Sequence, residues 1–496
     1  MSKMDGSLLR GFDRIENVCR EIEFDTKEKI TSPFSISDTQ IKTVNNSYLR
    51  TEQSEKYLPH NKTSVSVSND QLAKILMENN IFLNVNNSLY HWVNQKGHYV
   101  GMTTEYADKF IRQEIPEKYR YKINSNCIRE IVQWIKSYID AAEETDLLAN
   151  KKHLVAFTNG IFNFNMGSFS SHDSSYFFTS VINADYNTNV KNQGYHFDKF
   201  IKDLTGNDHE LYLRVQELFG YVLSEIRTVK FIPYLIGPKD TGKSIVLKIL
   251  EHLVGMEAFT NMSFDQLNKP EYLSQLLGKR LNTCGETSEF KLSKLDIFKK
   301  LSGGDYVTAR PIYGQPVNFV NSAVLVFAGN HLPKVNGLDK SNAFSQRIVV
   351  FPFYNPIPKE RQDTNLLDKL LEEKDYIVQW AIKGLLRWSN NNYQFTSSPE
   401  SIKLSLAYTE QNNSIDTFIK ERCTNHPYDQ VYKDDFISAY INYCIDIDVI
   451  PESKFTIHEY MKSLSEVSYK RYRDGLGNNK YGYIGLSLIH DNEEES

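Results

Sequence analysis

Residues 237–244 read Gly-Pro-Lys-Asp-Thr-Gly-Lys-Ser and match the pattern G-x-x-x-x-G-K-S. An apolar run at 231–236 precedes this glycine loop, and residues 244–253 carry apolar side chains at helical spacing. Glycines allow the tight turn that brings backbone N–H groups toward an anion, and a helix N-terminus adds a favourable partial charge. Because the loop stands between a strand and a helix, the sequence predicts a phosphate-binding loop rather than a chance glycine turn.

The loop residues have separate roles in this prediction. Lys243 would reach the β- and γ-phosphates of a nucleoside triphosphate, and the Ser244 hydroxyl would ligate Mg²⁺. The predicted cofactors are therefore ATP and Mg²⁺. The residues expected to contact the nucleotide are Gly237, Pro238, Lys239, Asp240, Thr241, Gly242, Lys243, Ser244 and Ile245.

Composition limits the class of protein and its location. The chain has 496 residues, 40% hydrophobic and 24% charged, as in ordinary globular proteins of two to four domains. The formal net charge of −5 means that any DNA contact must come from local basic patches. Five scattered cysteines without a C-x-x-C pair argue against a zinc site and suit a reducing compartment. With no leader-like or membrane-spanning apolar run, we expect a cytoplasmic protein without a membrane partner.

Periodicity and turn residues divide the chain into six parts. Hairpins are predicted where Asn86-Asn87-Ser88 and Asn159-Gly160 separate apolar runs, with helices expected over 71–79, 103–113, 125–142, 197–204 and 209–223. Downstream of the loop, helices are expected over 364–393, and three helices followed by a hairpin end the chain. The expected parts are 1–69 (a helix at 6–30 and a polar linker), 70–225 (a mixed α+β domain), 226–360 (the ATPase core), 361–413 (a helical lid or collar), 414–490 (a winged helix) and 491–496 (an acidic tail).

Three further groups in the core suit nucleotide hydrolysis. Phosphoryl transfer needs a carboxylate opposite the loop, and Glu286 after the polar run 281–285 is our choice, with Glu289 in reserve. Asn330 follows the apolar run 323–328, at the strand end where ligands bind in α/β sheets. Arg347 precedes another apolar run and could stabilise charge on the transferred phosphoryl group, although a fixed ion pair at a strand start would look the same.

Two stretches combine cations with aromatic rings, as nucleic-acid surfaces do. A hairpin expected over 307–319 carries Arg310 and Tyr313 near its tip, although an ordinary surface hairpin is an equal interpretation. The terminal helices and hairpin favour a winged helix that binds double-stranded origin DNA, with a solvated hairpin or a protein-docking domain as the alternatives. Its basic residues are Lys462, Lys470, Arg471, Arg473 and Lys480.

The motifs, taken in order, resemble those of superfamily 3 helicases, and most closely the phage/plasmid primase–helicase family related to poxvirus helicase-primases. They are the glycine loop, the acidic strand end, Lys300-Leu301-x-Gly303-Gly304-Asp305 with its hairpin, Gly329-Asn330-His331-Leu332-Pro333 and Gln346-Arg347-Ile348-x-x-Phe351. Upstream, Thr158-Asn159-Gly160-Ile161-Phe162, Asp185-Tyr186 and Leu218-Phe219-Gly220-Tyr221-Val222-Leu223 extend the resemblance, which covers roughly 150–490.

The resemblance implies an α/β fold with an AAA+-like P-loop core, a mixed α+β N-terminal domain and a C-terminal winged helix. It implies a homo-hexameric ring that moves 3′→5′ on single-stranded DNA and acts on forks. Lys243 and Ser244 would bind phosphate and Mg²⁺, Glu286 would take the Walker B role, and Asn330 would be the first sensor. Arg347 would act on ATP held by the neighbouring subunit.

The resemblance also implies DNA-facing roles for Arg310 and Tyr313 in the central channel. The chain lacks the length and cysteines of primase-bearing members, so a helicase without primase is expected, with a host primase or polymerase as partner. Compact initiator helicases of phage-related elements such as staphylococcal pathogenicity islands fit this layout. Two alternatives stay open: an ATP-switched initiator that does not unwind DNA, and a P-loop ATPase that remodels protein partners.

Overall fold

The structure is a computed structural model of the chain. The chain divides into two units, Met1–Glu55 and Lys56–Ser496, and the described residues all belong to the second. The helix expected at 6–30 and the linker up to residue 66 therefore lie outside the described residues. The described residues are 67–187, 194–227, 229–285, 291–292, 295–311, 314–335, 342–447, 449–473 and 479–489.

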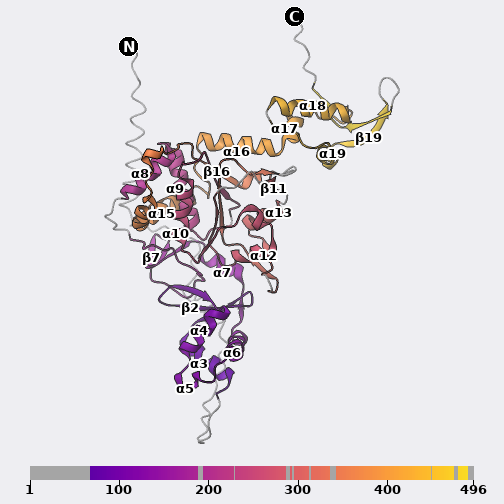
Figure 1. The fold of residues 1–496 in the computed structure, drawn as a ribbon. Coiled ribbons are helices and arrows are strands. Elements are labelled where there is room, and N and C mark those ends of the chain that lie inside the picture. The colour runs from indigo at the N-terminus through magenta and orange to yellow at the C-terminus, as the bar shows by residue number, and fades with distance from the viewer. Residues whose placement is uncertain are drawn as a thin grey trace, which may run out of the picture. The chain divides into compact units, whose positions relative to one another are not determined.

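A parallel sheet forms the centre of the fold (Figure 1). Its strands are adjacent in the order β16-β8-β14-β10-β9, and every neighbouring pair is parallel. The strand that precedes the glycine loop, β8, therefore lies inside the sheet, between β16 and β14. The strands are β8 (Ile232–Ile236), β9 (Phe259–Thr260), β10 (Leu281–Cys284), β14 (Val324–Gly329) and β16 (Ile348–Pro352).

Both faces of this sheet are buried, which explains why its strands read as unbroken apolar runs. Successive side chains of a strand point to opposite faces, so Tyr234 and Phe327 belong to one hydrophobic core and Leu235 and Val326 to the other. One core contains residues of α9 (His209–Leu223), α10 (Lys243–Val254) and α15 (Lys374–Asn390). The other contains residues of α11 (Phe264–Leu267), α12 (Pro270–Leu273) and α13 (Asp296–Gly303).

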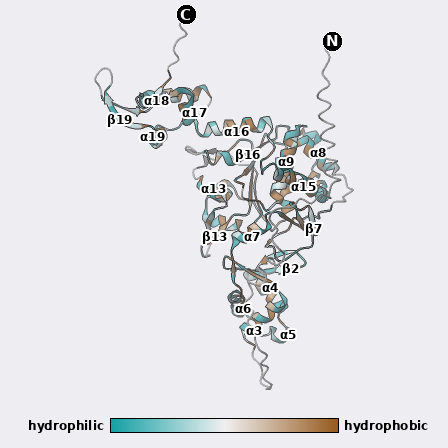
Figure 2. Cartoon of the chain, turned by 180° about the vertical axis from the view of Figure 1, so that it is seen from behind, coloured by the Kyte–Doolittle hydropathy of each residue, from teal (hydrophilic) through white to brown (hydrophobic). Residues whose placement is uncertain are grey.

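Helices α9 and α15 approach so closely that only glycine fits at their crossing. A Cβ on Gly220 would lie 2.5 Å from the Leu385 backbone nitrogen, and one on Gly384 would lie 2.2 Å from the Gln216 carbonyl oxygen. Both helices carry brown, hydrophobic stretches in Figure 2. Helix α9, although it lies upstream of residue 225, shares one hydrophobic core with the central sheet.

The segments before α9 form two smaller sheets, ordered β3-β2-β1-β4 and β5-β6-β7. Both predicted hairpins are present, and Asn86 and Asn87 adopt φ of 50° and 59°, the left-handed conformation that a two-residue turn requires. The helix expected over 125–142 ends at Tyr138, because Ala141 and Ala142 pair with β1 as a strand. The elements are α3 (Asn69–Asn79), β1 (Phe82–Val85), β2 (Ser88–Val93), β3 (His98–Gly101), α4 (Thr104–Glu114), α5 (Glu117–Arg120), α6 (Ser125–Tyr138), β4 (Ala141–Ala142), α7 (Glu144–Lys151), β5 (Leu154–Phe157), β6 (Gly160–Asn163), β7 (Ser168–Ser170) and α8 (Tyr195–Thr205).

The last part of the chain has its own hydrophobic core and the element order helix, two short strands, helix, helix, hairpin and a short final strand. Before it lies α16, a helix not expected from the sequence, which begins at Pro399 after the N-cap Ser398 and packs on β16. The remaining elements are β11 (Lys291–Leu292), β12 (Tyr306–Ala309), β13 (Val317–Val320), β15 (Lys334–Val335), α14 (Leu366–Glu372), α16 (Pro399–Asn412), α17 (Ser414–Arg422), β17 (Cys423–Thr424), β18 (Gln430–Tyr432), α18 (Lys433–Asp446), α19 (Lys454–Ser463), β19 (Ser468–Arg473), β20 (Asn479–Ile484), β21 (Ser487–Leu488) and the 3₁₀ helices Ser274–Leu276, Ser345–Arg347 and Lys359–Arg361.

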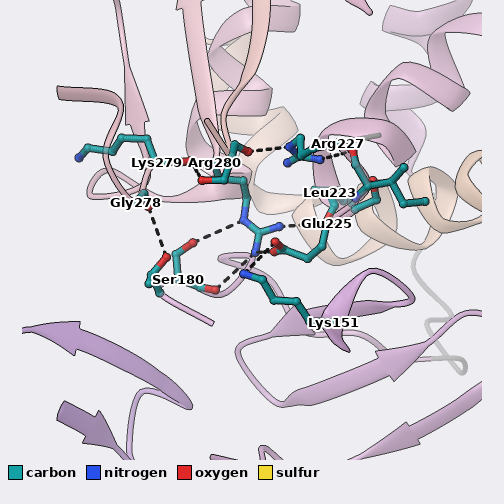
Figure 3. Close-up of polar contacts among 12 residues, drawn as sticks. Lys151, Ser180, Leu223, Glu225, Arg227, Gly278, Lys279 and Arg280 are labelled. Atoms are coloured by element: carbon teal, nitrogen blue, oxygen red, sulfur yellow. Dashed lines mark hydrogen bonds and ion pairs between the residues drawn. The ribbon is translucent and has the colours of Figure 1, made fainter. Parts of the chain in front are cut away.

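A buried ion cluster joins the upstream segments to the start of β10 (Figure 3). The Glu225 carboxylate pairs with Lys151 Nζ at 3.0 Å and with the Arg280 guanidinium, and all three side chains are less than 10% exposed. Arg280 also donates to the backbone oxygen of Leu223 at 3.1 Å. Arg227, just after Glu225 in the chain, donates to the Ser322 carbonyl oxygen at 2.6 Å. Three cations thus surround a single carboxylate.

This surplus of positive charge decides the protonation state of Glu225. Burial alone would raise the pKa of the carboxyl group, but Arg280, Lys151 and Arg227 together lower it to about 2. A carboxyl pKa that is lower in the folded than in the unfolded chain stabilises the fold above the unfolded value. This contribution is lost as the pH falls from the ordinary value of 4.5 toward about 2.

We predict that Glu225→Gln lowers the free energy of unfolding by about 3–5 kcal/mol, because it leaves buried cations without an anion. The variant should also lose less stability than the wild type between pH 5 and pH 2, since it lacks the titrating group. Thermal unfolding followed across this pH range measures both effects. Glu257→Gln, which changes an exposed glutamate, is the matched control. Equal unfolding midpoints for Glu225→Gln and Glu257→Gln would contradict the prediction.

Candidate functional site

The glycine loop emerges from the carboxyl edge of the central sheet. It connects β8 to α10, and its Asp240 and Gly242 adopt φ of 61° and 93°. Left-handed residues in such a loop turn successive N–H groups toward one side, the arrangement that binds phosphate oxygens. The N–H of Gly237 donates to the Gly329 carbonyl oxygen at 3.3 Å and ties the start of the loop to the end of β14.

Lys243, the first residue of α10, directs its side chain back into the loop. Its Nζ donates to the carbonyl oxygens of Gly237 at 2.6 Å and Pro238 at 2.5 Å. Burial lowers the pKa of this amine, and the nearby Asp240 carboxylate raises it in part. Thr241 is buried and donates to the Pro238 carbonyl oxygen at 3.2 Å, which braces the loop from within. The lysine, the loop amides and the exposed Ser244 therefore form one compact donor set.

The loop forms one wall of a cavity of about 1250 Å³. Asn330, at the end of β14, lines the same cavity, so the structure brings this predicted residue together with Lys243. The adjacent turn is fixed because the buried Tyr234 donates its hydroxyl proton to the His331 carbonyl oxygen at 2.7 Å. His331 itself is exposed and also borders the cavity.

Two walls of the cavity were not predicted from the sequence. One is the polar face of α8, with His196, Lys199 and Asp203 at helical spacing. Glu373 fixes this helix, because its carboxylate oxygens accept the N–H groups of His196 and Phe197 at 3.0 and 2.8 Å. A polar helix face of this kind usually faces solvent, so the sequence held no signal for a ligand site there.

The other unpredicted wall is the segment 353–363, here called the strap, which follows β16 and passes over the glycine loop. A Cβ on Gly237 would lie 1.8 Å from the Phe353 carbonyl oxygen, and the Phe353 N–H donates to the Ile236 carbonyl oxygen at 2.7 Å. Farther along the strap, the Ile357 N–H donates to the Asp240 carbonyl oxygen at 2.8 Å. The strap is thus bonded both to the strand before the loop and to the loop tip.

The predicted acidic residues Glu286 and Glu289 lie outside the described residues. The strand that leads to them, β10, is described and pairs with β14 in parallel. Strand β10 is polar for a buried strand, and its hydrogen bonds explain why. The buried Asn282 donates to the Met262 carbonyl oxygen at 3.0 Å and accepts the Met262 N–H at 2.9 Å, so its amide fastens the adjoining segment to the sheet.

Arg347 lies at the amino ends of the central strands, whereas the glycine loop lies at their carboxyl ends. The next residue, Ile348, pairs with Ile232, the first residue of β8, whereas the loop follows the last residue of β8. At about 3.3 Å per residue, the length of β8 separates the two by roughly 16 Å. Arg347 donates to Ser302 Oγ at 3.1 Å and to the Ala343 carbonyl oxygen, and it does not line the cavity.

The hairpin predicted around Arg310 is present. Strands β12 and β13 pair from Tyr306↔Val320 to Ala309↔Val317, and Arg310 is exposed at the start of the connecting loop. Its backbone N–H donates to the Pro270 carbonyl oxygen at 3.1 Å. Tyr313 lies outside the described residues.

The basic residues of the C-terminal hairpin lie on both of its faces. Side chains alternate along β19, so Arg471 and Arg473 lie on one face of the hairpin and Lys470 lies on the other. On one side Arg471 lies 5.8 Å from the centre of the Tyr481 ring. On the other side Lys480 lies 5.1 Å from the centre of the Tyr432 ring. Lys462 lies apart from the hairpin, in the last turn of α19, with Nζ 3.5 Å from a Glu459 carboxylate oxygen.

The described part of the chain lacks two further features. No cluster of three or more His, Cys, Asp or Glu side chains there could hold a metal ion. None of its helices combines the length and the apolar character needed to cross a membrane.

Two protein-family descriptions match parts of the chain. Residues 48–206 match the family described as "D5 N terminal like", and residues 235–347 match a "Family of unknown function (DUF5906)". The first match includes the two small sheets and α8. The second includes the glycine loop, Asn330 and Arg347.

One curated relative is the "Putative helicase L207/L206" of Acanthamoeba polyphaga mimivirus. It is 23% identical over 290 residues, a match that covers 53% of this chain and 28% of the relative. The chain therefore spans less than a third of that relative's length. Among solved structures, the A form apo structure of the NrS-1 C terminal region matches with a TM-score of 0.47 at 9% identity and covers 84% of this chain and 99% of that one. The apo structure of NrS-1 C terminal region (305-718) matches with a TM-score of 0.46 at 10% identity and covers 85% and 99%.

We predict that Gly237→Ala displaces the strap from the loop, because the added Cβ would overlap the Phe353 carbonyl oxygen. Hydrogen exchange of the Ile357 amide, which donates to Asp240, should become roughly tenfold faster or more as that bond opens. Gly255→Ala is the control, because Gly255 also has positive φ but a Cβ there meets no atom within 4 Å. Equal Ile357 exchange in both variants would show that the strap does not depend on this contact.

Proposed function

We propose that this protein is an ATP-dependent DNA helicase of a replication system, assembled as a hexameric ring that moves 3′→5′ on single-stranded DNA. The proposal rests on one observation: the candidate catalytic groups lie at two opposite ends of the central strands. Lys243 and Asn330 line one cavity, whereas Arg347 lies at the far edge of the same sheet. The "D5 N terminal like" match and the similarity to a viral protein named as a helicase favour the same function.

The cavity would bind the triphosphate with the loop around its terminal phosphates. The amides of residues 239–244 and the Lys243 ammonium would stabilise the charge that develops as water attacks the γ-phosphorus and the bond to the β-phosphate oxygen breaks. Asn330, which lines the same cavity, would orient that water by donating or accepting a hydrogen bond. Bound Mg²⁺, held by Ser244 and by an acid that we assign to Glu286, would neutralise phosphate charge.

Arg347 would complete the site of the neighbouring subunit. About 16 Å of sheet separates it from its own loop, so it cannot reach a phosphate bound there. The same position makes it available to a second copy that packs against this edge. Hydrolysis would then require assembly, which couples ATP turnover to the ring that encircles DNA.

DNA would be contacted at two places. The exposed Arg310 and the neighbouring Tyr313 would face the strand in the ring channel. The C-terminal element order suits a winged helix, and cations on both faces of β19–β20 suit a wing that lies between two phosphate backbones of origin DNA.

The test of the motor is ATP-dependent unwinding of a forked duplex with a 3′ tail. We predict that Lys243→Ala and Arg347→Ala each abolish unwinding, and that Arg347→Ala lowers ATP hydrolysis by roughly 10³-fold or more. Mixing the two variants should restore part of the hydrolysis, because mixed rings contain sites with an intact Lys243 and a neighbouring Arg347. Lys202→Ala, an exposed lysine of α8 outside the cavity, is the control.

No recovery of hydrolysis on mixing would contradict the placement of Arg347 in a neighbouring site. ATP hydrolysis and origin binding without unwinding by the wild type would instead support the ATP-switched initiator. Hydrolysis that no DNA stimulates would support an ATPase that remodels proteins.

The proposed role of the β19–β20 hairpin as a DNA-binding wing leads to a separate prediction. The pair Arg471→Ala/Arg473→Ala on one face and the pair Lys470→Ala/Lys480→Ala on the other should each weaken duplex binding. Each pair should also reduce the slope of log affinity against log salt by about 2, as two phosphate contacts are lost. Lys420→Ala, on α17, is the control. Binding and salt slopes equal to those of the control in both pairs would exclude the hairpin from the DNA interface.

A further inference from the structure

The strap brings one more cation to the nucleotide cavity. Its last turn is the 3₁₀ helix Lys359–Arg361, in which the Arg361 N–H donates to the Pro358 carbonyl oxygen at 2.8 Å. Arg361 lines the cavity, as do Lys243 and Asn330, whereas Lys359 of the same turn does not. Of the two cationic residues in this 3₁₀ turn, only Arg361 therefore lines the cavity.

No protein group in the described part of the chain neutralises Arg361. The guanidinium has no carboxylate there within ion-pair distance, and the side chain is exposed. The nearest acid in sequence that lines the cavity, Asp363, pairs with Lys369 Nζ at 2.5 Å instead. A cation that lines a cavity and has no carboxylate within ion-pair distance is suited to an anionic ligand.

Two hydrogen bonds of neighbouring residues tie the turn that carries Arg361 to the glycine loop. The Ile357 N–H is bonded to Asp240 at the loop tip, and the Gln362 side chain donates from Nε2 to the Ile357 carbonyl oxygen at 3.0 Å. The two ends of the strap turn are thus tied to each other, and the turn is tied to the end of the loop that would surround phosphate.

We propose that Arg361 binds the phosphates of the nucleoside triphosphate held by its own subunit, opposite Lys243. This inference rests on the proposed function of the glycine loop and adds a second cation in cis, distinct from Arg347, which serves a neighbouring site. The planar guanidinium can donate two parallel hydrogen bonds to one phosphate, which a lysine cannot do. Arg361 would thereby also fasten the strap over the bound nucleotide.

The test compares binding of a non-hydrolysable ATP analogue with Mg²⁺ in the full-length chain by isothermal titration calorimetry. Arg361→Ala should weaken binding roughly 10- to 100-fold, as expected for the loss of hydrogen bonds to a charged group, and Arg361→Lys should recover only part of it. Lys359→Ala, in the same turn but outside the cavity, should bind within about twofold of the wild type. Equal affinities of Arg361→Ala and Lys359→Ala would overturn the proposal.

Lys243→Ala separates this outcome from a failure of the proposed function. If the wild type binds the analogue and Lys243→Ala does not, the loop is a nucleotide site whatever Arg361 does. If the wild type does not bind the analogue, the proposed function fails, and the inference fails with it.

Mixing experiments decide whether Arg361 acts in cis. Arg361→Ala mixed with Arg347→Ala should regain ATP hydrolysis, because each subunit supplies what the other lacks. Arg361→Ala mixed with Lys243→Ala should not, because both residues belong to the same half of the site. Recovery in the second mixture would place Arg361 in the neighbouring site and contradict the proposal.

Discussion

The close approach of Gly237 to the Phe353 carbonyl oxygen is the constraint on which the candidate site depends. Strands β8 and β16 are parallel neighbours, so the chain leaves both at the same end of the sheet, and there the two exits cross in contact at Gly237 and Phe353. They can cross only where one residue lacks a Cβ, because that atom would lie 1.8 Å from the oxygen. The crossing places the strap beside the loop, and the strap in turn closes one side of the cavity. A glycine usually explained by its contact with phosphate is thus also required by the fold.

The sequence predicted those parts of the fold and site that are formed by residues close together in the chain. The glycine loop, its strand and its helix are contiguous, so the motif predicted their arrangement, and the apolar runs predicted β14 and β16 as buried strands. The turn at Asn86-Asn87 was equally local, since both residues tolerate the left-handed conformation. Asn330 needed one further step, the rule that ligands bind at the carboxyl ends of parallel strands, and the structure places it in the wall of the cavity.

The rest of the site could not be predicted because it is assembled by packing between distant segments. His196 on α8 and Arg361 on the strap show no pattern in sequence that separates them from solvated surface residues. Their approach to the loop depends on how α8 is held by Glu373, and on the crossing at Gly237. The ion cluster of Lys151, Glu225 and Arg280 was missed for the same reason, since its members lie 74 and 55 residues apart (Figure 3). Helix α16 differs from these, because its start signal, Ser398-Pro399, is local and visible in the sequence.

The measurement that tests the central claim most directly is an experimental structure of the protein with a non-hydrolysable ATP analogue and Mg²⁺. The account predicts that the terminal phosphates lie within the loop and that Lys243 Nζ leaves the carbonyl oxygens of Gly237 and Pro238 to bond phosphate oxygens. It also predicts that Asn330 faces the γ-phosphate of the same nucleotide while the Arg347 that approaches it comes from a neighbouring copy. A nucleotide bound elsewhere, with Lys243 still bonded to its own loop, would contradict the account.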